Sequence, residues 1–249
     1  MKKFELTSEF ITNIFGTKLF RIKALIEFGN VKAGELGGFV EKEENLNQDG
    51  DAWVYGNARV YGNARVYGNA RVYGNARVYG DAWVYGNARV YGNARVYGNA
   101  WVYDNARVHG NARVYGDACV YGDAWVCGDA CVYGDACVCG DAWVHGNARV
   151  YGNARVYGNA RVYGNACVCG DACVCGDASY ATVHGFGSEY RTTTFFKTKA
   201  GDIGVKCGCF YGNLSEFRKK VVETHGETKK AKEYLMLADL MEFRFSDNS

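Results

Sequence analysis

Proline is absent from the 249-residue sequence, and no apolar stretch is long enough to cross a membrane. Because proline cannot donate a backbone N–H, its absence suits strands that use every N–H in a hydrogen-bonded ladder. The segment from Phe4 to Phe28 is interrupted by charges throughout, so we expect neither a signal peptide nor a membrane anchor. We therefore expect a cytoplasmic protein that does not associate with membranes.

A large charge of one sign is also missing, since the formal net charge is only +2. The overall charge thus gives no signal for a nucleic-acid or membrane partner. The 11 cysteines would indicate a disulfide scaffold only in a small secreted chain, and this chain is neither small nor expected to be secreted.

One six-residue unit dominates the sequence. Gly-Asn-Ala-Arg-Val-Tyr and its variants occur twenty-one times without an insertion between Gly50 and Cys175, and a repeat this short predicts a solenoid. The Val and Ala of every copy are unchanged, whereas the residue before Val is Arg in eleven copies and Trp or Cys in ten. We infer that Val and Ala point inward, as in Val54, Ala58 and Val60, and that the other side chains form the outer faces.

This pattern resembles the hexapeptide-repeat family of left-handed parallel β-helices. In that family three hexads form one triangular coil, so the resemblance implies about seven coils and a length on the order of 33 Å at ~4.8 Å per coil. The expected fold class is an all-β solenoid, a left-handed parallel β-helix, between an N-terminal cap and a small C-terminal α+β domain. The expected boundaries are 1–49 for the cap, 50–178 for the repeats and 179–249 for the C-terminal domain.

The two ends lack the repeat. Residues 20–26 alternate like a half-buried strand before Phe39 and Val40, and this segment is the simplest cap for the unpaired strand edges at one end of a solenoid. After the repeats we expect strands over 191–197 and 204–211, joined by a turn at 200–202. Asn213 and Glu216 form a capping box that opens a helix ended by Gly226, and a second helix is expected over 229–241.

The terminal segments also resemble uncharacterised bacteriophage and prophage proteins. The resemblance rests on Phe28-Gly29, Gly37-Gly38-Phe39-Val40 and Asn45-Leu46, which run into Trp53, and on the C-terminal part. It implies a phage-related setting, in the bacterial host cytoplasm, and no particular activity.

Residues eighteen apart should stack in columns on the outer faces. Arg with aromatic neighbours is typical of phosphate binding and base stacking, so these columns are the candidate binding site. The alternative, which we favour, is that the columns only shield the sheet while corner Asn and Asp hydrogen-bond their own turns. The candidate binding residues are Arg59, Arg77, Arg95 and Arg113 beside Tyr61, Tyr79, Tyr97 and Tyr115, a Tyr column that Tyr133 and Tyr151 continue.

Three groups of residues invite a metal interpretation. His109, Cys127 and His145 lie eighteen apart at one hexad position, so they should stack with a thiol between two imidazoles. Cys207 and Cys209 share one strand face, with His184 or His225 as a further ligand, but this spacing is not specific for zinc. The four cysteines between Cys167 and Cys175 should diverge around a corner. We therefore expect no metal and no cofactor.

Many hexapeptide-repeat proteins transfer acyl groups with a catalytic His near a protruding loop. Here no loop interrupts the hexads, and His109 and His145 lie within repeats that offer no shaped pocket. We expect a non-enzymatic scaffold, spacer or binding protein whose partner is another protein or a second copy in a homo-oligomer. Polyanion or nucleic-acid binding by the columns is the alternative, and an acyltransferase-like enzyme is the third interpretation.

Overall fold

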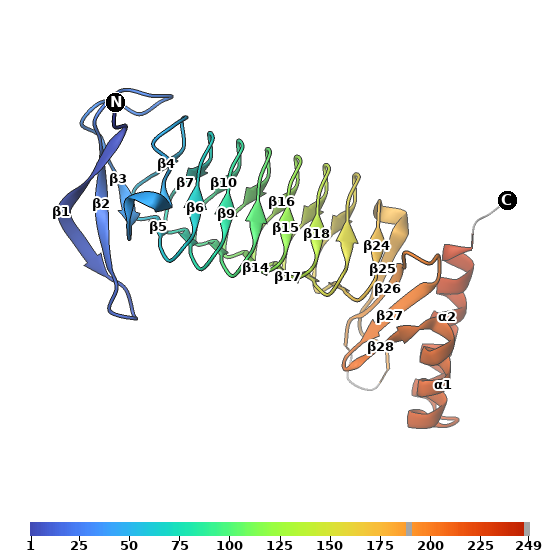
Figure 1. Cartoon of the computed structure of the whole chain (residues 1–249). Helices are drawn as coiled ribbons and strands as arrows, with labels where there is room; N and C mark the ends of the chain where they lie inside the picture. The colour runs from blue at the N-terminus through green and yellow to red at the C-terminus, as the bar shows by residue number, and fades with distance from the viewer. Residues whose placement is uncertain (188–190, 247–249) are drawn as a thin grey trace.

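A rod of parallel coils forms the centre of the molecule. The computed structural model describes residues 1–187 and 191–246. Antiparallel strands close the N-terminal end of the rod, and a small sheet with two helices lies at the other end (Figure 1).

Each coil contributes one short strand to each of three faces. The β5 face has the order β3 (Leu36–Val40), β5 (Arg59–Val60), β8 (Arg77–Val78), β11 (Arg95–Val96), β14 (Arg113–Gly116), β17 (Cys131–Gly134), β20 (Arg149–Val150), β23 (Cys167–Val168). The β6 face has the order β6 (Arg65–Val66), β9 (Trp83–Val84), β12 (Trp101–Val102), β15 (Cys119–Val120), β18 (Cys137–Val138), β21 (Arg155–Val156), β24 (Cys173–Val174). The β4 face has the order β4 (Trp53–Val54), β7 (Arg71–Val72), β10 (Arg89–Val90), β13 (Arg107–Val108), β16 (Trp125–Val126), β19 (Trp143–Val144), β22 (Arg161–Val162).

The eighteen-residue register is held by backbone hydrogen bonds between coils. The N–H of Arg95 donates to the carbonyl oxygen of Ala112 at 2.9 Å, and the N–H of Tyr97 donates to that of Val114 at 3.0 Å. At the corners the glycines have positive φ, and a Cβ on Gly80 would lie 3.0 Å from the nitrogen of Gly98. Glycine is therefore favoured at the corners both by the backbone conformation and by the close approach of the next coil, and Asp104, with φ of +56°, is the exception among the repeats.

The interior of the rod is built from two residue types. Every Val and Ala of the repeats is buried, with at most 1% of its surface exposed. A Val and an Ala alternate around each coil, and the in-register stacking places Val on Val and Ala on Ala. The prediction of inward Val and Ala is confirmed, and so is the fold class, a parallel β-solenoid with N-terminal strands and a small C-terminal domain of sheet and helices.

The rod has about eight coils, one more than the repeat count predicts. Val40 of β3 pairs with Val60, and Leu46 forms a parallel bridge with Val66, so both occupy inward positions of an additional first coil. These pairs are twenty residues apart instead of eighteen. The surroundings of Val40 and Leu46 do not follow the hexad, which is why the repeat pattern did not reveal them.

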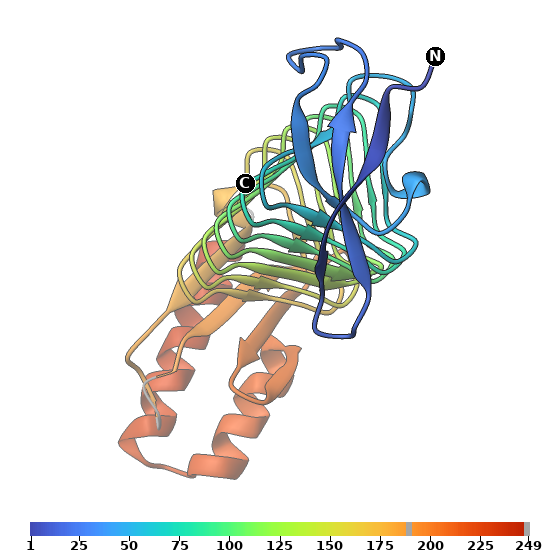
Figure 2. The same cartoon turned by 90° about the vertical axis from the view of Figure 1, so that its left-hand side faces the viewer.

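The N-terminal end is closed by strands and by buried polar side chains. β1 (Phe4–Thr12) and β2 (Lys18–Ala24) pair antiparallel, β2 pairs with β3, and the hairpin crosses the open end of the coils (Figure 2). Lys3 is 1% exposed, and its Nζ donates to the carbonyl oxygens of Gly50 at 3.2 Å and Ala52 at 3.0 Å.

Two further residues of this end depart from the behaviour of the repeats. The buried amide of Asn45, in the 3-10 turn Glu43–Asn45, donates to the carbonyl oxygens of Gly62 and Ala64, which no preceding strand reaches. Trp53 stands at an outward hexad position but is fully buried, because the rings of Phe4 and Phe28 pack edge-on against it. The interpretation of the residue before Val as outward and solvent-facing is therefore wrong for Trp53.

The C-terminal end is closed by a strand that serves two cores. After the 3-10 turn Asp177–Ser179, the sheet has the order β25 (Tyr180–Val183), β26 (Thr193–Lys197), β27 (Ile203–Cys207), β28 (Phe210–Asn213). Phe196 of β26 is fully buried in the core of the rod, whereas its neighbour Phe195 is fully buried in a second core under the helices. Successive side chains of a strand point to opposite faces, so β26 joins the rod to the C-terminal domain.

The C-terminal domain follows most of the sequence expectations. α1 (Leu214–His225) opens with the predicted capping box of Asn213 and Glu216 and ends at Gly226, as predicted. α2 (Lys229–Phe245) continues one turn beyond the predicted end, because Phe245 adds to its buried side. The single strand predicted over 204–211 is wrong: the chain turns at Gly208, where φ is +56°, and β27 and β28 pair antiparallel as a hairpin.

Candidate functional site

The predicted Tyr column exists as a continuous stack. On the β5 face the rings of Tyr61, Tyr79, Tyr97, Tyr115, Tyr133 and Tyr151 follow one another at centroid distances of 4.9 Å with interplanar angles of 1° to 4°. The regular spacing arises because each ring leaves a backbone position that the ladder repeats at every coil.

The predicted Arg column lies beside it. Arg59, Arg77, Arg95 and Arg113 are register partners in successive strands. Within residues 1–187 and 191–246, none of these four side chains forms an ion pair with a carboxylate. The column therefore keeps its positive charge and can attract an anion.

The ring faces of the Tyr column are not available to a ligand. A nucleobase between two rings would need a ring separation of about 7 Å, twice a normal carbon contact distance. The observed spacing of 4.9 Å is fixed by the ladder, so only ring edges and phenol groups face outward. A nucleobase therefore cannot stack between the Tyr rings of the column. A polyanion could be attracted only by the charge of the arginines.

Burial also changes the phenol groups. It raises the pKa of Tyr79 and Tyr97, and it raises the pKa of Tyr103 on the β6 face to about 12. Arg95 and Arg113 lower the pKa of Tyr79, but the effect of burial is larger. The columns therefore present neutral phenols at physiological pH, able to donate a hydrogen bond.

Corner Asn and Asp side chains form ladders of their own. The Nδ2 of Asn93 donates to Oδ1 of Asn111 at 3.2 Å, and the Nδ2 of Asn111 donates to Oδ1 of Asp129 at 3.0 Å. The expectation that these residues hydrogen-bond their own turns is thus wrong here: their partners lie one coil away. The ladder reinforces the eighteen-residue register.

His109, Cys127 and His145 lie on one face in three successive coils, as the spacing predicts. The ring of His109 stacks on Tyr91 at 4.7 Å and meets Trp125 edge-on at 6.0 Å, and its Nε2 is buried without a hydrogen-bond partner. Burial, with a smaller effect of Arg107, lowers the pKa of His109, and burial raises the pKa of Cys127. In the described part of the chain, no group of three or more His, Cys, Asp and Glu side chains converges as a metal site.

The other thiol candidates are dispersed. Cys207 accepts a hydrogen bond from the hydroxyl of Thr193 at 3.2 Å, whereas Cys209 is exposed in the turn that follows. Cys207 and His225 line one hollow of about 230 Å³. Cys167 belongs to the β5 face and Cys173 to the β6 face, so the cysteines between 167 and 175 do diverge around a corner.

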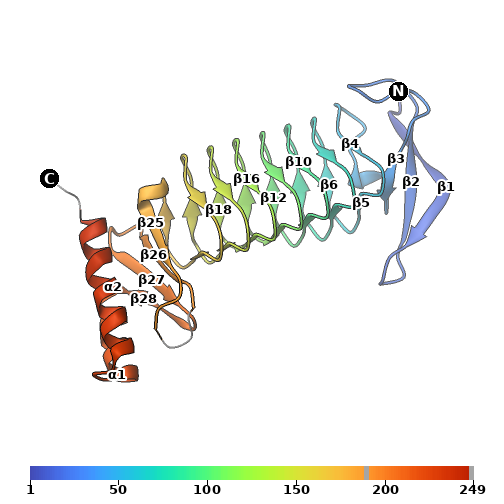
Figure 3. The same cartoon turned by 180° about the vertical axis from the view of Figure 1, so that it is seen from behind.

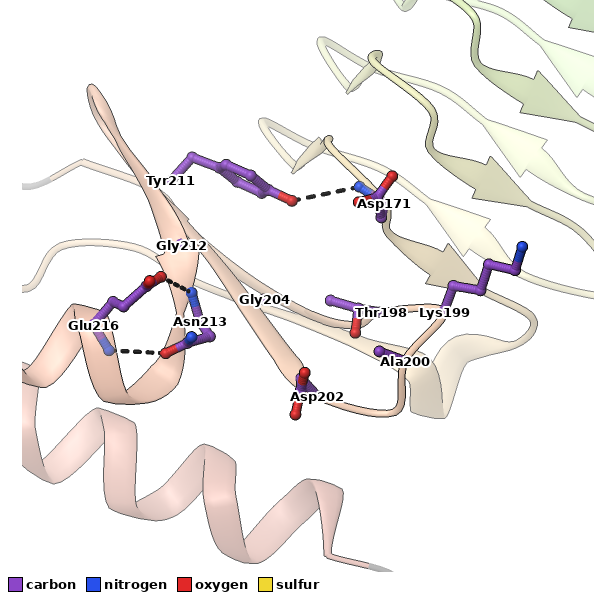
Figure 4. A pocket seen from close by; sticks show the side chains of 10 residues that line it. All are labelled: Asp171, Thr198, Lys199, Ala200, Asp202, Gly204, Tyr211, Gly212, Asn213 and Glu216. Atoms are coloured by element: carbon purple, nitrogen blue, oxygen red, sulfur yellow. Dashed lines mark hydrogen bonds between the residues drawn. The ribbon is translucent and has the colours of Figure 1, made fainter.

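Two hollows near the C-terminal end of the rod were not predicted from the sequence. One has a volume of about 720 Å³ and lies where the last coil meets the β26–β27 turn and β28 (Figure 4). In it the hydroxyl of Tyr211 accepts a hydrogen bond from the N–H of Asp171 at 3.4 Å, and Glu216 is engaged in the α1 capping box. Lys199 and Asp202 supply opposite charges to its wall.

The second hollow, of about 800 Å³, lies on the β6 face between Tyr121 and Lys199. Its floor contains Cys137 and Cys139, short side chains at positions where most coils carry Arg, Trp or Tyr. The sequence contains a signal for the pair of thiols at its edge but not for the hollow itself, because Cys119 and Cys137 are the only two cysteines that lie eighteen residues apart.

Comparison with protein families agrees with the geometry of the coils. The model of the YdcK β-solenoid repeat matches ten stretches within the repeats, most of which overlap. The chain is a tandem-repeat β-solenoid protein. A comparison with curated proteins finds no match. The matched residues are 52–68, 58–72, 64–80, 70–86, 82–98, 88–103, 94–110, 112–128, 148–164 and 154–170.

The match covers repeats only, and so it describes the rod and neither of the ends. In the part of the chain that the structure describes, no helix is long and apolar enough to span a membrane.

Proposed function

We propose that this β-solenoid is a non-enzymatic scaffold or spacer that holds two terminal interaction surfaces apart. The observation that carries this proposal is a single continuous core, which runs from Phe4 through all the repeats to Phe196. Both ends therefore pack into the rod itself and are not attached by flexible linkers. At ~4.8 Å per coil, eight coils give a separation on the order of 38 Å.

Exposed apolar side chains at the two ends support the proposal of two separate interaction surfaces. In the N-terminal hairpin turn, Ile14 is 88% exposed and Phe15 is 77% exposed. On the outer side of α2, Met236 and Phe243 are each 71% exposed, with Leu240 between them. These groups lie at opposite ends of the molecule (Figure 3). Exposed apolar patches mark interaction sites, so a partner protein or a second copy in a homo-oligomer would attach there.

The absence of catalysis is part of the proposal. His109 is packed between Tyr91 and Trp125, so it does not present a free imidazole to a substrate in a shaped pocket. The resemblance of the terminal segments to bacteriophage and prophage proteins supports a phage-related setting and a host-cytoplasmic location for the rod.

A second candidate function is polyanion binding, favoured by the unpaired column of Arg59, Arg77, Arg95 and Arg113. Such binding would depend on charge, since the Tyr rings are closed to bases. The affinity would then fall steeply with salt as bound counterions are released.

Three variants separate the two functions. One replaces Ile14 and Phe15 with Gln, one replaces Met236 and Phe243 with Gln, and one replaces the four arginines of the column with Gln. The measurements are self-association by light scattering, partner capture from a bacterial lysate, and titration with single-stranded RNA at low salt.

The scaffold proposal expects both end variants to lose association or capture while the column variant retains them. It is contradicted if association and capture survive both end changes. Loss of salt-dependent RNA binding in the column variant alone would instead establish the polyanion function. An acyl-CoA substrate panel tests the enzymatic interpretation, and turnover that depends on His109 or His145 would overturn the non-enzymatic assignment.

A further inference from the structure

The β6 face changes character near its C-terminal end. On this face the outward residues that directly precede each Val form one column. In chain order they are Arg65, Trp83, Trp101, Cys119, Cys137, Arg155 and Cys173. Where the two thiols follow one another, the long side chains that cover the sheet elsewhere are missing. The hollow of about 800 Å³ begins at the second of these thiols, Cys137, and extends over Arg155 and Cys173 to Lys199 of the C-terminal domain.

Cys119 and Cys137 are direct neighbours. They are register partners in the adjacent parallel strands β15 and β18, and both side chains are half-buried on the outer surface. Adjacent strands lie about 4.8 Å apart, which is inside the Cα separation of 4.4–6.8 Å that disulfides span. The thiols need only a small approach of their Cβ atoms to be joined.

The surroundings distinguish the two sulfurs. Arg155 is the next register partner of Cys137 and lies one coil farther from Cys119. The S–H of Cys119 donates to the carbonyl oxygen of Asp117 at 3.8 Å, and Cys137 is a second acceptor beside it. When Cys137 is ionised, its charged sulfur is the stronger of the two acceptors.

These contacts make Cys137 the acidic member of the pair. The hydrogen bond from Cys119 and, to a smaller extent, the charge of Arg155 hold the pKa of Cys137 below its ordinary value, whereas burial and Asp135 act in the opposite direction. The same pairing raises the pKa of Cys119. Other titratable groups around the hollow are Tyr121, Cys139, Tyr157, Asp171, Cys173 and Lys199.

We propose that Cys137 and Cys119 form a redox modification site, in which the Cys137 thiolate reacts with a hydroperoxide and is then joined to Cys119 as a disulfide. The site is independent of the scaffold proposal, since it rests on the register of two strands and the hollow above them. The hollow gives a small oxidant access to Cys137, and Cys119 is held next to the sulfur it must attack.

The reaction needs only the two thiols and one hydroperoxide. The Cys137 thiolate attacks one oxygen of the hydroperoxide, the O–O bond breaks, and the departing alkoxide takes up a proton to become an alcohol, leaving a sulfenic acid. The sulfur of Cys119 loses its proton and attacks the sulfenic sulfur, whose hydroxide leaves with that proton as water. Two thiols are thus oxidised by two electrons, and one hydroperoxide is reduced to an alcohol and water.

The test uses the full-length chain carrying Cys131→Ser and Cys139→Ser. These changes are needed because the hexapeptides that begin at Asp117 and Asp129 have the same sequence, and because Cys139 shares a peptide with Cys137. The protein is treated with one equivalent of hydrogen peroxide, alkylated with iodoacetamide, denatured and cleaved before each Asp. The proposal expects one major cross-linked product, joining the peptide of Cys119 to the peptide of Cys137.

Cys127 serves as the internal control, because its thiol lies in the same acidic stretch and burial raises its pKa. It should stay reduced while the pair is oxidised. A second experiment measures iodoacetamide alkylation of Cys137 at pH 7 with and without Cys119→Ala, which removes the hydrogen-bond donor. We expect Cys119→Ala to slow the alkylation by about tenfold, the loss of roughly one pKa unit of thiolate stabilisation.

Three results would overturn the proposal. One is oxidation of Cys137 to the sulfinic acid with Cys119 still reduced. Another is alkylation of Cys127 as fast as that of Cys137. The third is an unchanged alkylation rate of Cys137 in Cys119→Ala, with the fold of the variant verified by circular dichroism.

Discussion

The rod and its two ends stabilise the same kind of backbone in different ways. Within the rod each coil packs against a coil of nearly the same sequence. Val therefore stacks on Val, and each strand pairs with the strand eighteen residues away. At the ends no further copy exists. At the N-terminal edge the strand β3 pairs with the first repeats, and polar side chains such as Lys3 and Asn45 donate to carbonyl oxygens there. At the C-terminal edge the aromatic residue Phe196, on a crossing strand, enters the core. Repetition makes the rod tolerant of changes in length, whereas each end depends on single residues.

The largest loss of unfolding free energy is expected for a charged substitution in the middle of the rod. Val90→Asp places a charge in an interior lined only by Val and Ala, with no donor to pair it, and should cost about 4 kcal/mol or more. Arg89→Asp, one residue away and exposed, should change the free energy of unfolding by no more than about 0.5 kcal/mol. Urea titration followed by circular dichroism compares the two variants. Similar midpoints would mean that the interior is not packed as described.

Phe196→Ala and Phe195→Ala test whether β26 serves two cores. Each removes a fully buried ring and should cost about 3–5 kcal/mol. Hydrogen exchange should report different regions, because Phe196 packs in the core of the rod and Phe195 against Phe217 of α1. Phe196→Ala should expose the amides of β23 and β24, and Phe195→Ala those of α1. Identical exchange maps would show that the two cores open as one.

Asn45→Leu tests the polar closure of the first coil. The carbonyl oxygens of Gly62 and Ala64 would lose their donor while remaining covered, at a cost of about 1–3 kcal/mol. Asn93→Leu is the matched control, since its amide bonds an exposed neighbour in the corner ladder. Thermal unfolding should show a clear loss for Asn45→Leu and a small change for Asn93→Leu. The reverse order would contradict the assigned role of Asn45.

The lowered pKa of Lys3 predicts a smaller change in stability, which depends on pH. Burial lowers its pKa from 10.5 to about 8, although Asp51 and Asp49 act in the opposite direction. Between these values the unfolded chain binds a proton that the folded chain has lost, so stability should rise with pH from about 8 to 10. The difference in unfolding free energy between wild type and Lys3→Met, followed by urea titration, isolates this contribution. A flat or falling difference over that range would contradict it.

The smallest effect is expected from removing one whole coil. Deletion of residues 62–79 keeps the pairing of Val40 with Val60 and brings Gly80 and Ala82 to the places of Gly62 and Ala64 beside Asn45. Every inward Val and Ala of the repeats still lies opposite one of its own kind. The protein should melt close to wild type and be shorter by ~4.8 Å in small-angle scattering. Deletion of residues 62–67 alone rotates the C-terminal domain by a third of a turn and misaligns every column, and it should lower the melting temperature more. Equal melting temperatures would show that the column register contributes little.

The candidate site was only partly accessible from the sequence. The positions of the Tyr and Arg columns follow from the eighteen-residue spacing, and the structure contains them. What the columns can bind does not follow from spacing, because the 4.9 Å ring separation that closes the Tyr faces is a property of the assembled ladder. The hollow over Cys137 needs Lys199 as a wall, and that residue is distant in sequence.

The repeats alone determined that the chain forms a solenoid with a Val and Ala interior, because each hexad contains the inward residues, the outward residues and the corner residue of its own strand. Three hexads per coil was what the resemblance to hexapeptide-repeat proteins implied. Only the tertiary structure decided how the solenoid starts and stops. Val40 and Leu46 join the first coil, Trp53 is buried by Phe4 and Phe28, and Phe196 enters the last coil through pairings between segments that share no pattern. A local period fixes contacts between copies, whereas contacts between unique segments depend on how the whole chain closes.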